Sequence, residues 1–272
     1  MNFLDVNSDP LIMGILNVTP DSFSDGGQFL KPDIAIAHAR QMVEEGASII
    51  DIGAESTRPG AEPVSTAEQL KRVIPVIDGL RSTLKPDVYL SIDSHDPAVA
   101  EGAVVAGANM INDISGGGHS EMLSLAALHR IPIVLMHMQG SPQSMQNEPM
   151  YADVVGEIGE FLNTRAEQAK AAGVLSTNMI IDPGIGFGKT KIHNLEILRR
   201  LEEFVALGYP VMLGASRKRF MGAICQETVF KELAGATCAT TVIGVRAGVK
   251  IFRVHDVREN RQAMEVALAT MG

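Results

Sequence analysis

Two groups of polar residues in this sequence have the chemistry to bind a small charged ligand. The first group supplies hydrogen-bond acceptors, and its members follow short apolar runs: Asp93, Asn112 and Asp182. Buried carboxylate and amide oxygens suit a flat heterocycle that is rich in N–H donors. The competing interpretation is that these residues are N-caps of helices, which is weaker for Asp182 because Pro183-Gly184 predicts a turn.

The second group is cationic and lies mostly near the end of the sequence. It consists of Lys218, Arg253 and His255, with Arg58 and Arg217 as further cations. Ammonium and guanidinium groups suit a phosphate or a pyrophosphate, and the competing interpretation is a solvated basic loop. Asn17 adds one neutral oxygen. One such ligand is enough for a Mg²⁺ that keeps most of its waters and is held chiefly by pyrophosphate oxygens.

These residues are far apart in the sequence, so the fold must bring them together. Short apolar runs alternate with helical patterns, and the expected strands are residues 11–16, 48–52, 88–92, 109–111, 132–136, 179–181, 211–213 and 250–252. The expected helices include residues 33–45, 119–129, 232–247 and one continuous helix over 195–205. Strict alternation predicts a parallel sheet, and eight repeats predict its closure. We therefore expect an α/β fold, a (β/α)₈ TIM barrel forming a single domain over residues 1–272, since an open doubly wound sheet would normally use fewer strands.

The barrel gives the polar residues a common location. The carboxyl ends of its strands meet at one face, where enzymes of this fold carry their active sites. The residues at or just past these ends are Asn17, Asp93, Asn112, His137, Asp182, Lys218, Arg253 and His255. Phosphate sites in such barrels usually follow the last two strands, where the cationic group lies. We expect one shared site with acids on one side and cations on the other.

Composition and motifs exclude several other functions. The formal charge of -9 argues against a nucleic-acid surface, and no apolar run approaches the length of a membrane span. The N-terminal residues lack the pattern of a signal peptide, so we expect a cytoplasmic protein. Cys225 and Cys238 are expected to be reduced, and the seven histidines lack zinc-binding spacing. The glycine-rich residues 184–190 do not form a P-loop because position 183 is Pro.

Seven segments carry a resemblance to a known family. They are MGILNVTPDSFSDGG (13–27), DIGAESTRPGA (51–61), SIDS (91–94), NDISGG (112–117), IDPGIGFGK (181–189), GASRKRF (214–220) and RVHDV (253–257). With these segments the chain resembles the dihydropteroate synthases, enzymes of folate biosynthesis. These enzymes condense 6-hydroxymethyl-7,8-dihydropterin diphosphate with 4-aminobenzoate to give 7,8-dihydropteroate and diphosphate. The resemblance covers nearly the whole length.

The resemblance implies a role for each matching residue. Asp93, Asn112, Asp182 and Lys218 would hold the pterin ring. Asn17, Arg253 and His255 would hold the diphosphate, with Asn17 also binding Mg²⁺. Thr57, Arg58, Pro59, Phe187 and Lys218 would frame 4-aminobenzoate. Arg219 stands where some members have a Ser that contacts the aminobenzoate carboxylate, so that contact stays open.

The resemblance also implies a homodimer that forms through the late helices. Two other functions stay open. A methyltransferase of the methyltetrahydrofolate and corrinoid type shares the fold and the acidic pterin contacts but has no use for the cationic group. A catalytically silent paralogue would bind the pterin, or stabilise a partner, without turnover.

Overall fold

Short runs rich in Ile, Leu, Val and Met form an eight-stranded parallel sheet, as predicted. The computed structural model describes residues 8–19, 32–55, 62–141 and 143–271. The strands are β1 (Leu11–Asn17), β2 (Ile49–Gly53), β3 (Tyr89–Asp93), β4 (Met110–Asp113), β5 (Ile133–Met136), β6 (Met179–Asp182), β7 (Met212–Leu213) and β8 (Ile251–Val254). Neighbours in the sheet follow the order β6-β5-β4-β3-β2-β1-β8-β7, and a parallel bridge between Ile181 and Val211 closes the barrel.

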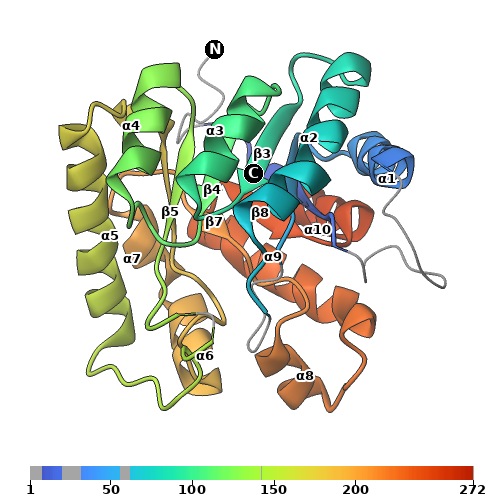
Figure 1. The fold of residues 1–272 in the computed structure, drawn as a ribbon. Coiled ribbons are helices and arrows are strands. Elements are labelled where there is room, and N and C mark those ends of the chain that lie inside the picture. The colour runs from blue at the N-terminus through green and yellow to red at the C-terminus, as the bar shows by residue number, and fades with distance from the viewer. Residues whose placement is uncertain (1–7, 20–31, 56–61, 142, 272) are drawn as a thin grey trace.

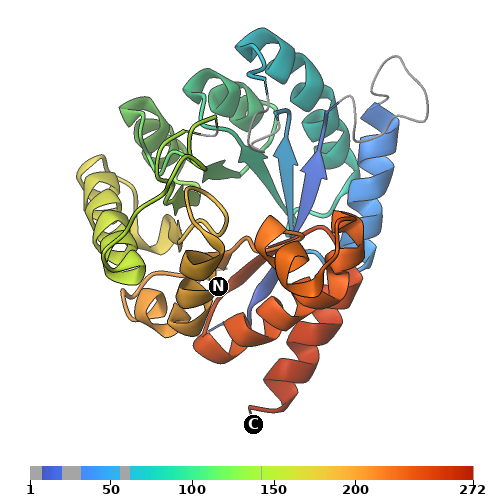
Figure 2. The same ribbon diagram turned by 90° about the horizontal axis from the view of Figure 1, so that it is seen from below.

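Helices surround the barrel on its outer side (Figures 1 and 2). They are α1 (Pro32–Glu44), α2 (Thr66–Thr83), α3 (Pro97–Val105), α4 (Ser120–His129), α5 (Val154–Ala171), α6 (Lys191–Arg199), α7 (Leu201–Val205), α8 (Arg219–Cys225), α9 (Ala234–Ala247) and α10 (Val257–Ala269). Two 3₁₀ helices, η2 (Ser176–Asn178) and η3 (Phe230–Leu233), complete the set in the part of the chain that the structure describes. Figure 2 views the barrel from the end at which α6 and α8 lie.

The prediction of one helix over residues 195–205 is wrong. Arg200 has φ −119° and ψ 29°, outside the helical region, and it separates α6 from α7. Its guanidinium group donates hydrogen bonds to Asp153, ahead of α5, and to Glu203 in α7. The apolar pattern continues across this break, so hydrophobic periodicity could not reveal it.

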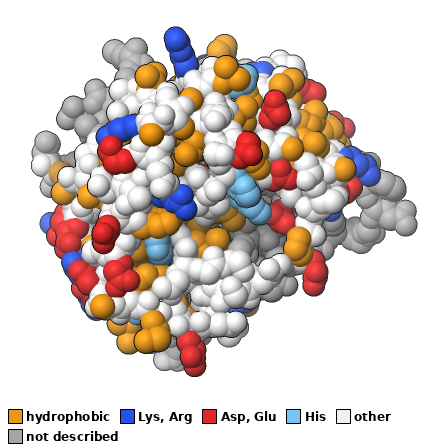
Figure 3. All heavy atoms as spheres, turned by 60° about the vertical axis from the view of Figure 1, so that its left-hand side comes forward, with side chains coloured by type: hydrophobic (Ala, Val, Ile, Leu, Met, Phe, Trp, Pro, Cys, Tyr) orange, Lys and Arg blue, Asp and Glu red, His pale blue; other side chains and the backbone are white. Residues whose placement is uncertain are grey.

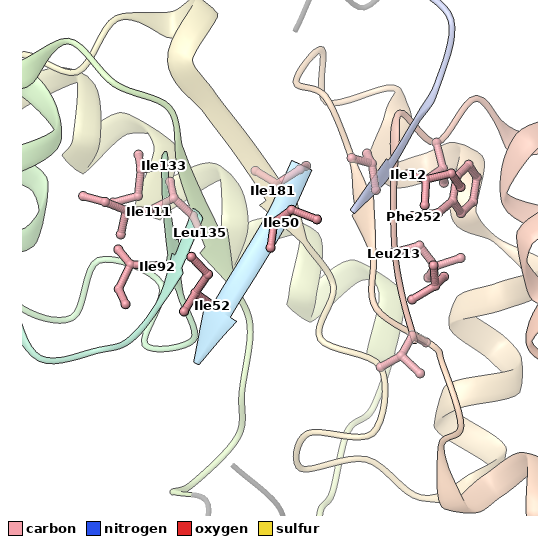
Figure 4. Packing of buried hydrophobic residues seen from close by; sticks show 14 of the residues in the cluster. Ile12, Ile50, Ile52, Ile92, Ile111, Ile133, Leu135, Ile181, Leu213 and Phe252 are labelled. Atoms are coloured by element: carbon pink, nitrogen blue, oxygen red, sulfur yellow. The ribbon is translucent and has the colours of Figure 1, made fainter. Parts of the chain in front are cut away.

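The residues that face outward from the strands form the larger of two apolar layers. Ile50, Ile92 and Phe252 belong to this layer, which packs between the sheet and the helices (Figure 4). A second layer fills the inside of the barrel at the amino ends of the strands: Met13, Ile49, Met110, Val134, Ile180, Met212 and Ile251. Two buried faces explain why the strands read as continuous apolar runs.

The inside of the barrel changes from apolar to polar along each strand. Successive inward residues are two positions apart, so Met110 is followed by Asn112, Ile180 by Asp182, and Ile251 by Arg253. The apolar layer therefore forms the floor of a site whose polar residues lie at the carboxyl ends.

A helix must be both long and apolar to cross a membrane. None of the helices in the described residues meets both requirements. The side of the molecule at the left of Figure 1 carries charged side chains of both signs between separate apolar groups (Figure 3).

Candidate active site

A cavity lies at the carboxyl ends of the strands. Its lining includes six of the predicted site residues: Asp93, Asn112, Asp182, Phe187, Lys218 and Arg253. The prediction that acids and cations from distant segments meet in one site is thus confirmed for these six residues. The prediction that the acids and the cations lie on separate sides is wrong, because Arg253 forms an ion pair with Asp93. The individual roles of these residues remain predictions.

Two buried oxygen atoms at this cavity have no hydrogen-bond partner among the described residues. They are Oδ1 of Asp93 and Oδ1 of Asn112, and Asn112 is only 2% exposed. Unpaired buried acceptors cost folding free energy, so they indicate a ligand that supplies N–H donors. The structure therefore supports a donor-rich heterocycle as the ligand.

The alternative that the acidic group consists of helix N-caps is wrong. The N-cap of α3 is Asp96, whose side chain accepts from the Ala98 N–H, and the N-cap position of α4 is His119. Asp182 Oδ1 accepts a 2.7 Å hydrogen bond from the Gly184 N–H, within the turn that Pro183-Gly184 predicts. The acidic residues therefore face the cavity and do not begin helices.

Asp51 is a residue of this site that the sequence analysis did not identify. It is fully buried, and its Oδ2 accepts hydrogen bonds from Arg253 Nε at 2.6 Å and from Asn112 Nδ2 at 2.9 Å. One carboxylate thus orients a cation and an amide that both line the cavity. Asp51 lies in the middle of β2, and only the inward alternation of that strand could have indicated its role.

Arg253 forms the centre of a buried ion network. Besides Asp51, its Nη2 donates to Asp93 Oδ2 at 2.6 Å, while Nη1 takes part in neither pair. Burial by itself lowers the pKa of Arg253. Asp51 and Asp93 are the main groups that raise it, and the pKa is raised overall, so the guanidinium stays charged. A permanent cation is therefore held at the inner wall of the cavity.

The carboxyl groups that face the cavity have raised pKa values. Burial raises the pKa of Asp93, Arg253 lowers it in part, and Asp51 raises it again. Burial also raises the pKa of Asp182 to about 6, against the Gly184 N–H and the charges of Lys218, Lys189 and Arg253. Perturbed groups gathered in a cleft are typical of functional sites.

Two further cationic residues lie at the same end of the barrel. Lys218 places its Nζ 4.1 Å from the centroid of the Phe187 ring, which is a cation–π contact. His255 follows β8, and its Nδ1 lies 2.9 Å from Ser216 Oγ, which also accepts from the His255 backbone N–H. The segment after β7 thus fixes the imidazole that follows β8.

The structure corrects the prediction that Arg217 adds to the phosphate-binding cations. Arg217 forms a bidentate ion pair with Asp256, and its backbone N–H donates to Thr237 Oγ1. Arg217 therefore joins the segments after β7 and β8. Arg219 is exposed at the first position of α8.

The remaining predicted residues have different outcomes. Asn17 is the last residue of β1 and pairs with Gly53 of β2, so it lies at the expected end of the barrel. His137 is buried behind the cavity wall and contacts Lys189. Thr57, Arg58 and Pro59 lie outside the described residues.

The donor set fits a Mg²⁺ held mainly by its substrate. Among the residues that the structure describes, no three His, Cys, Asp or Glu side chains are grouped to hold a metal ion. Asn17 offers one amide oxygen at the carboxyl end of β1, the strand that pairs with β8, on which Arg253 lies. This set suits a Mg²⁺ that keeps waters and binds phosphate oxygens.

Comparison with known proteins agrees with this geometry. The model of the family described as "Pterin binding enzyme" matches residues 13–255. This chain belongs to that family. The dihydropteroate synthase of Synechocystis sp. is 49% identical over 257 residues, which are 94% of this chain and 88% of the relative.

Solved structures show the same similarity. The dihydropteroate synthase of Xanthomonas albilineans with 4-aminobenzoic acid has a TM-score of 0.91 and 41% identity, covering 97% of this chain and 94% of the other. The structure described as this enzyme in complex with 7,8-dihydropteroate has a TM-score of 0.88 and 38% identity, covering 99% and 96%. These comparisons confirm the fold and the resemblance drawn from the seven segments.

Proposed function

We propose that this chain is a transferase that catalyses the dihydropteroate synthase reaction of folate biosynthesis. It condenses 6-hydroxymethyl-7,8-dihydropterin diphosphate with 4-aminobenzoate and releases diphosphate. The observation that carries this proposal is the cavity that Asp93, Asn112, Asp182, Lys218 and Arg253 line together. Relatives that are named for this reaction and match over nearly the whole chain support it.

The acidic residues of the cavity and Asn112 would hold the pterin ring. The unpaired oxygens of Asp93 and Asn112 accept from its N–H groups, and Asp182 accepts from its amino end. Because the ring satisfies buried acceptors, it binds in one orientation. Lys218 reaches the other edge of the ring.

The cationic residues would stabilise the leaving diphosphate. Negative charge grows on this group as its bond to the methylene carbon of the pterin breaks, and Arg253 and His255 offset that charge. Asn17 would help to hold Mg²⁺, which supplies further positive charge to the diphosphate when it is bound. The electron-rich pterin stabilises positive charge on the methylene carbon, so bond breaking leads the attack.

Phe187 and Lys218 would form the described part of the 4-aminobenzoate site. Their cation–π contact presents a flat apolar ring beside an ammonium, which suits an aryl carboxylate. The amine of 4-aminobenzoate is uncharged near neutral pH and already nucleophilic. The reaction therefore needs no strong general base from the protein.

Product formation tests the proposed function. The protein is incubated with the pterin diphosphate, 4-aminobenzoate and Mg²⁺, and dihydropteroate is followed by chromatography. We expect dihydropteroate and diphosphate in equal amounts. Pterin binding without product would identify the silent paralogue instead. In a separate incubation with methyltetrahydrofolate and a corrinoid, transfer of the methyl group to the corrinoid would identify the methyltransferase.

Asp51→Asn is expected to lower turnover by about tenfold to a hundredfold, because Arg253 loses one of its two carboxylate partners, the fully buried one. The amide still accepts one hydrogen bond, so we expect pterin affinity to change less than kcat. Steady-state kinetics and calorimetry measure the two quantities. Equal losses in both would show that Asp51 does not act through Arg253.

We also propose a homodimer. Four apolar side chains are partly exposed on α8, on α9 and at η3: Ile224, Val229, Phe230 and Ile243. Burying them in a second copy would remove apolar surface from water. Light scattering should give twice the mass of one chain, and a monomer would contradict this proposal. The cytoplasmic location stays a prediction from the sequence.

A further inference from the structure

Lys189 is a buried cation that the proposed mechanism does not use. It follows β6 and precedes α6, and only 3% of its surface is exposed. It does not line the cavity, although Asp182, Gly184, Ile185 and Phe187 of the same segment do. An unused charge buried this deeply needs a physical reason, because burying an ammonium is costly.

The surroundings of Lys189 match the three donors of an ammonium group. Its Nζ lies 2.8 Å from the carbonyl oxygen of Phe187, 2.9 Å from His137 Nδ1 and 3.4 Å from the carbonyl oxygen of His137. A neutral amine has only two N–H groups, so three acceptors favour the charged form. Burial and the Lys189 charge lower the pKa of His137 to about 3. A neutral His137 with its proton on Nε2 has an unprotonated Nδ1 that can accept from Lys189.

These contacts join two strand ends. His137 follows β5, and its backbone N–H donates to the carbonyl oxygen of Asp182. Its ring packs edge-on against Phe161 of α5, with 4.9 Å between the ring centroids. Lys189 therefore ties the segment after β6 to a residue that the sheet and α5 already hold in place.

The segment between Asp182 and Lys189 can approach this anchor only because it is rich in glycine. Gly184 and Gly188 have φ of +68° and +61°. A Cβ at Gly184 would lie 1.9 Å from the carbonyl oxygen of His137, and a Cβ at Gly188 would lie 2.4 Å from the carbonyl oxygen of Gln139. Lys189 is the last residue of this segment, and its contacts with His137 hold that end in place. Asp182 is the first residue of the segment, and Phe187 lies two residues before Lys189.

We propose that Lys189 is a positioning residue for the reaction: its buried ammonium fixes Phe187 against Lys218 and keeps the Asp182 carboxylate ionised for the pterin. The first effect passes through the Phe187 carbonyl, because the same residue offers its ring to Lys218. The second is electrostatic. His137 contacts Lys189 and donates its backbone N–H to the Asp182 carbonyl oxygen, so Lys189 and Asp182 share a neighbour, and the charge of Lys189 lowers the pKa of Asp182. This role rests on the proposed function.

Several other charged groups near Lys189 and Asp182 also affect the pKa of Asp182. Lys218 after β7 and Arg253 on β8 also lower the pKa of Asp182, and the Gly184 N–H does so by hydrogen bonding. Around Lys189 lie His137, Asp182, Lys218 and His193 of α6. Burial lowers the pKa of Lys189 to about 7, so Lys189 is charged at pH 6, where Asp182 titrates.

The test compares Lys189→Met with Lys191→Met, an exposed neighbour two residues away. Calorimetry measures the affinity for 6-hydroxymethylpterin from pH 5 to 8. In the parent protein the affinity should fall as the pH drops through about 6, since protonation removes the charge of Asp182 and turns one of its acceptor oxygens into a donor. In Lys189→Met the midpoint should move up by about half a pH unit or more. The KM for 4-aminobenzoate should rise several-fold with a smaller change in kcat, and Lys191→Met should match the parent.

Other outcomes separate this inference from the proposed function. A folded Lys189→Met with the parent's midpoint and KM would overturn the role of Lys189 and leave the function intact. A parent protein that does not bind the pterin would overturn both. If Lys189→Met does not fold, His137→Leu removes one acceptor and keeps two carbonyls, so a smaller upward shift is expected. An unchanged midpoint in His137→Leu would then overturn the role.

Discussion

Replacing Asp182 by Asn should weaken pterin binding by about 3 kcal/mol, or roughly a hundredfold in Kd. Asn keeps the shape and one oxygen, so the Gly184 N–H can still be satisfied. Its amide group, however, points a donor at the donors of the pterin and carries no charge. The variant should fold normally, because ionising a carboxyl whose pKa is raised by burial costs folding free energy that Asn does not incur.

Calorimetry at pH 7.5 with 6-hydroxymethylpterin measures this loss. Asp87→Asn is a matched control, because Asp87 is exposed in the connection between α2 and β3, at the opposite end of the barrel. The control should bind like the parent. Parent-like affinity in Asp182→Asn would remove Asp182 from the pterin site.

The second large effect is expected at Arg253. Arg253→Lys keeps the positive charge between Asp51 and Asp93. It loses the planar guanidinium, whose Nε and Nη2 pair with the two carboxylates at once. We expect kcat to fall by about a hundredfold to a thousandfold, because an ammonium cannot retain both carboxylates and also contact the diphosphate. The affinity for the pterin without its diphosphate should change by less than tenfold.

Arg253→Ala is a harsher version of the same experiment. It leaves two buried carboxylates without a counter-ion, which should cost about 3–5 kcal/mol of folding free energy. Thermal unfolding therefore has to accompany the kinetics of either variant. Arg199→Lys, at an exposed position of α6, is the matched control. Parent-like release of diphosphate by folded Arg253→Lys would end the assignment of Arg253 to the leaving group.

Much of the fold was predictable because the barrel has a strong local signal. Strands buried on both faces appear as short apolar runs, so all eight were found. The prediction for residues 195–205 was wrong because side-chain contacts of Arg200 break a helix whose apolar pattern continues. Tertiary contacts of a single polar residue leave no periodic trace in the sequence.

The site was predictable only where chemistry coincides with a strand end. Asp93, Asn112 and Asp182 follow apolar runs, and the topology of the barrel brings them together. Asp51 was missed because it lies within a strand, where a lone Asp gives no indication of its partners. Arg217 was misassigned because the sequence does not show that Asp256 neutralises it.

The central claim is that one cavity holds the pterin and its diphosphate at the same time. A crystal structure of the protein with the bound pterin diphosphate tests it most directly. We expect the ring N–H groups within hydrogen-bond distance of Asp93, Asn112 and Asp182, and the diphosphate beside Arg253 and His255. A ligand bound elsewhere, or with its diphosphate pointing away from Arg253, would contradict this account.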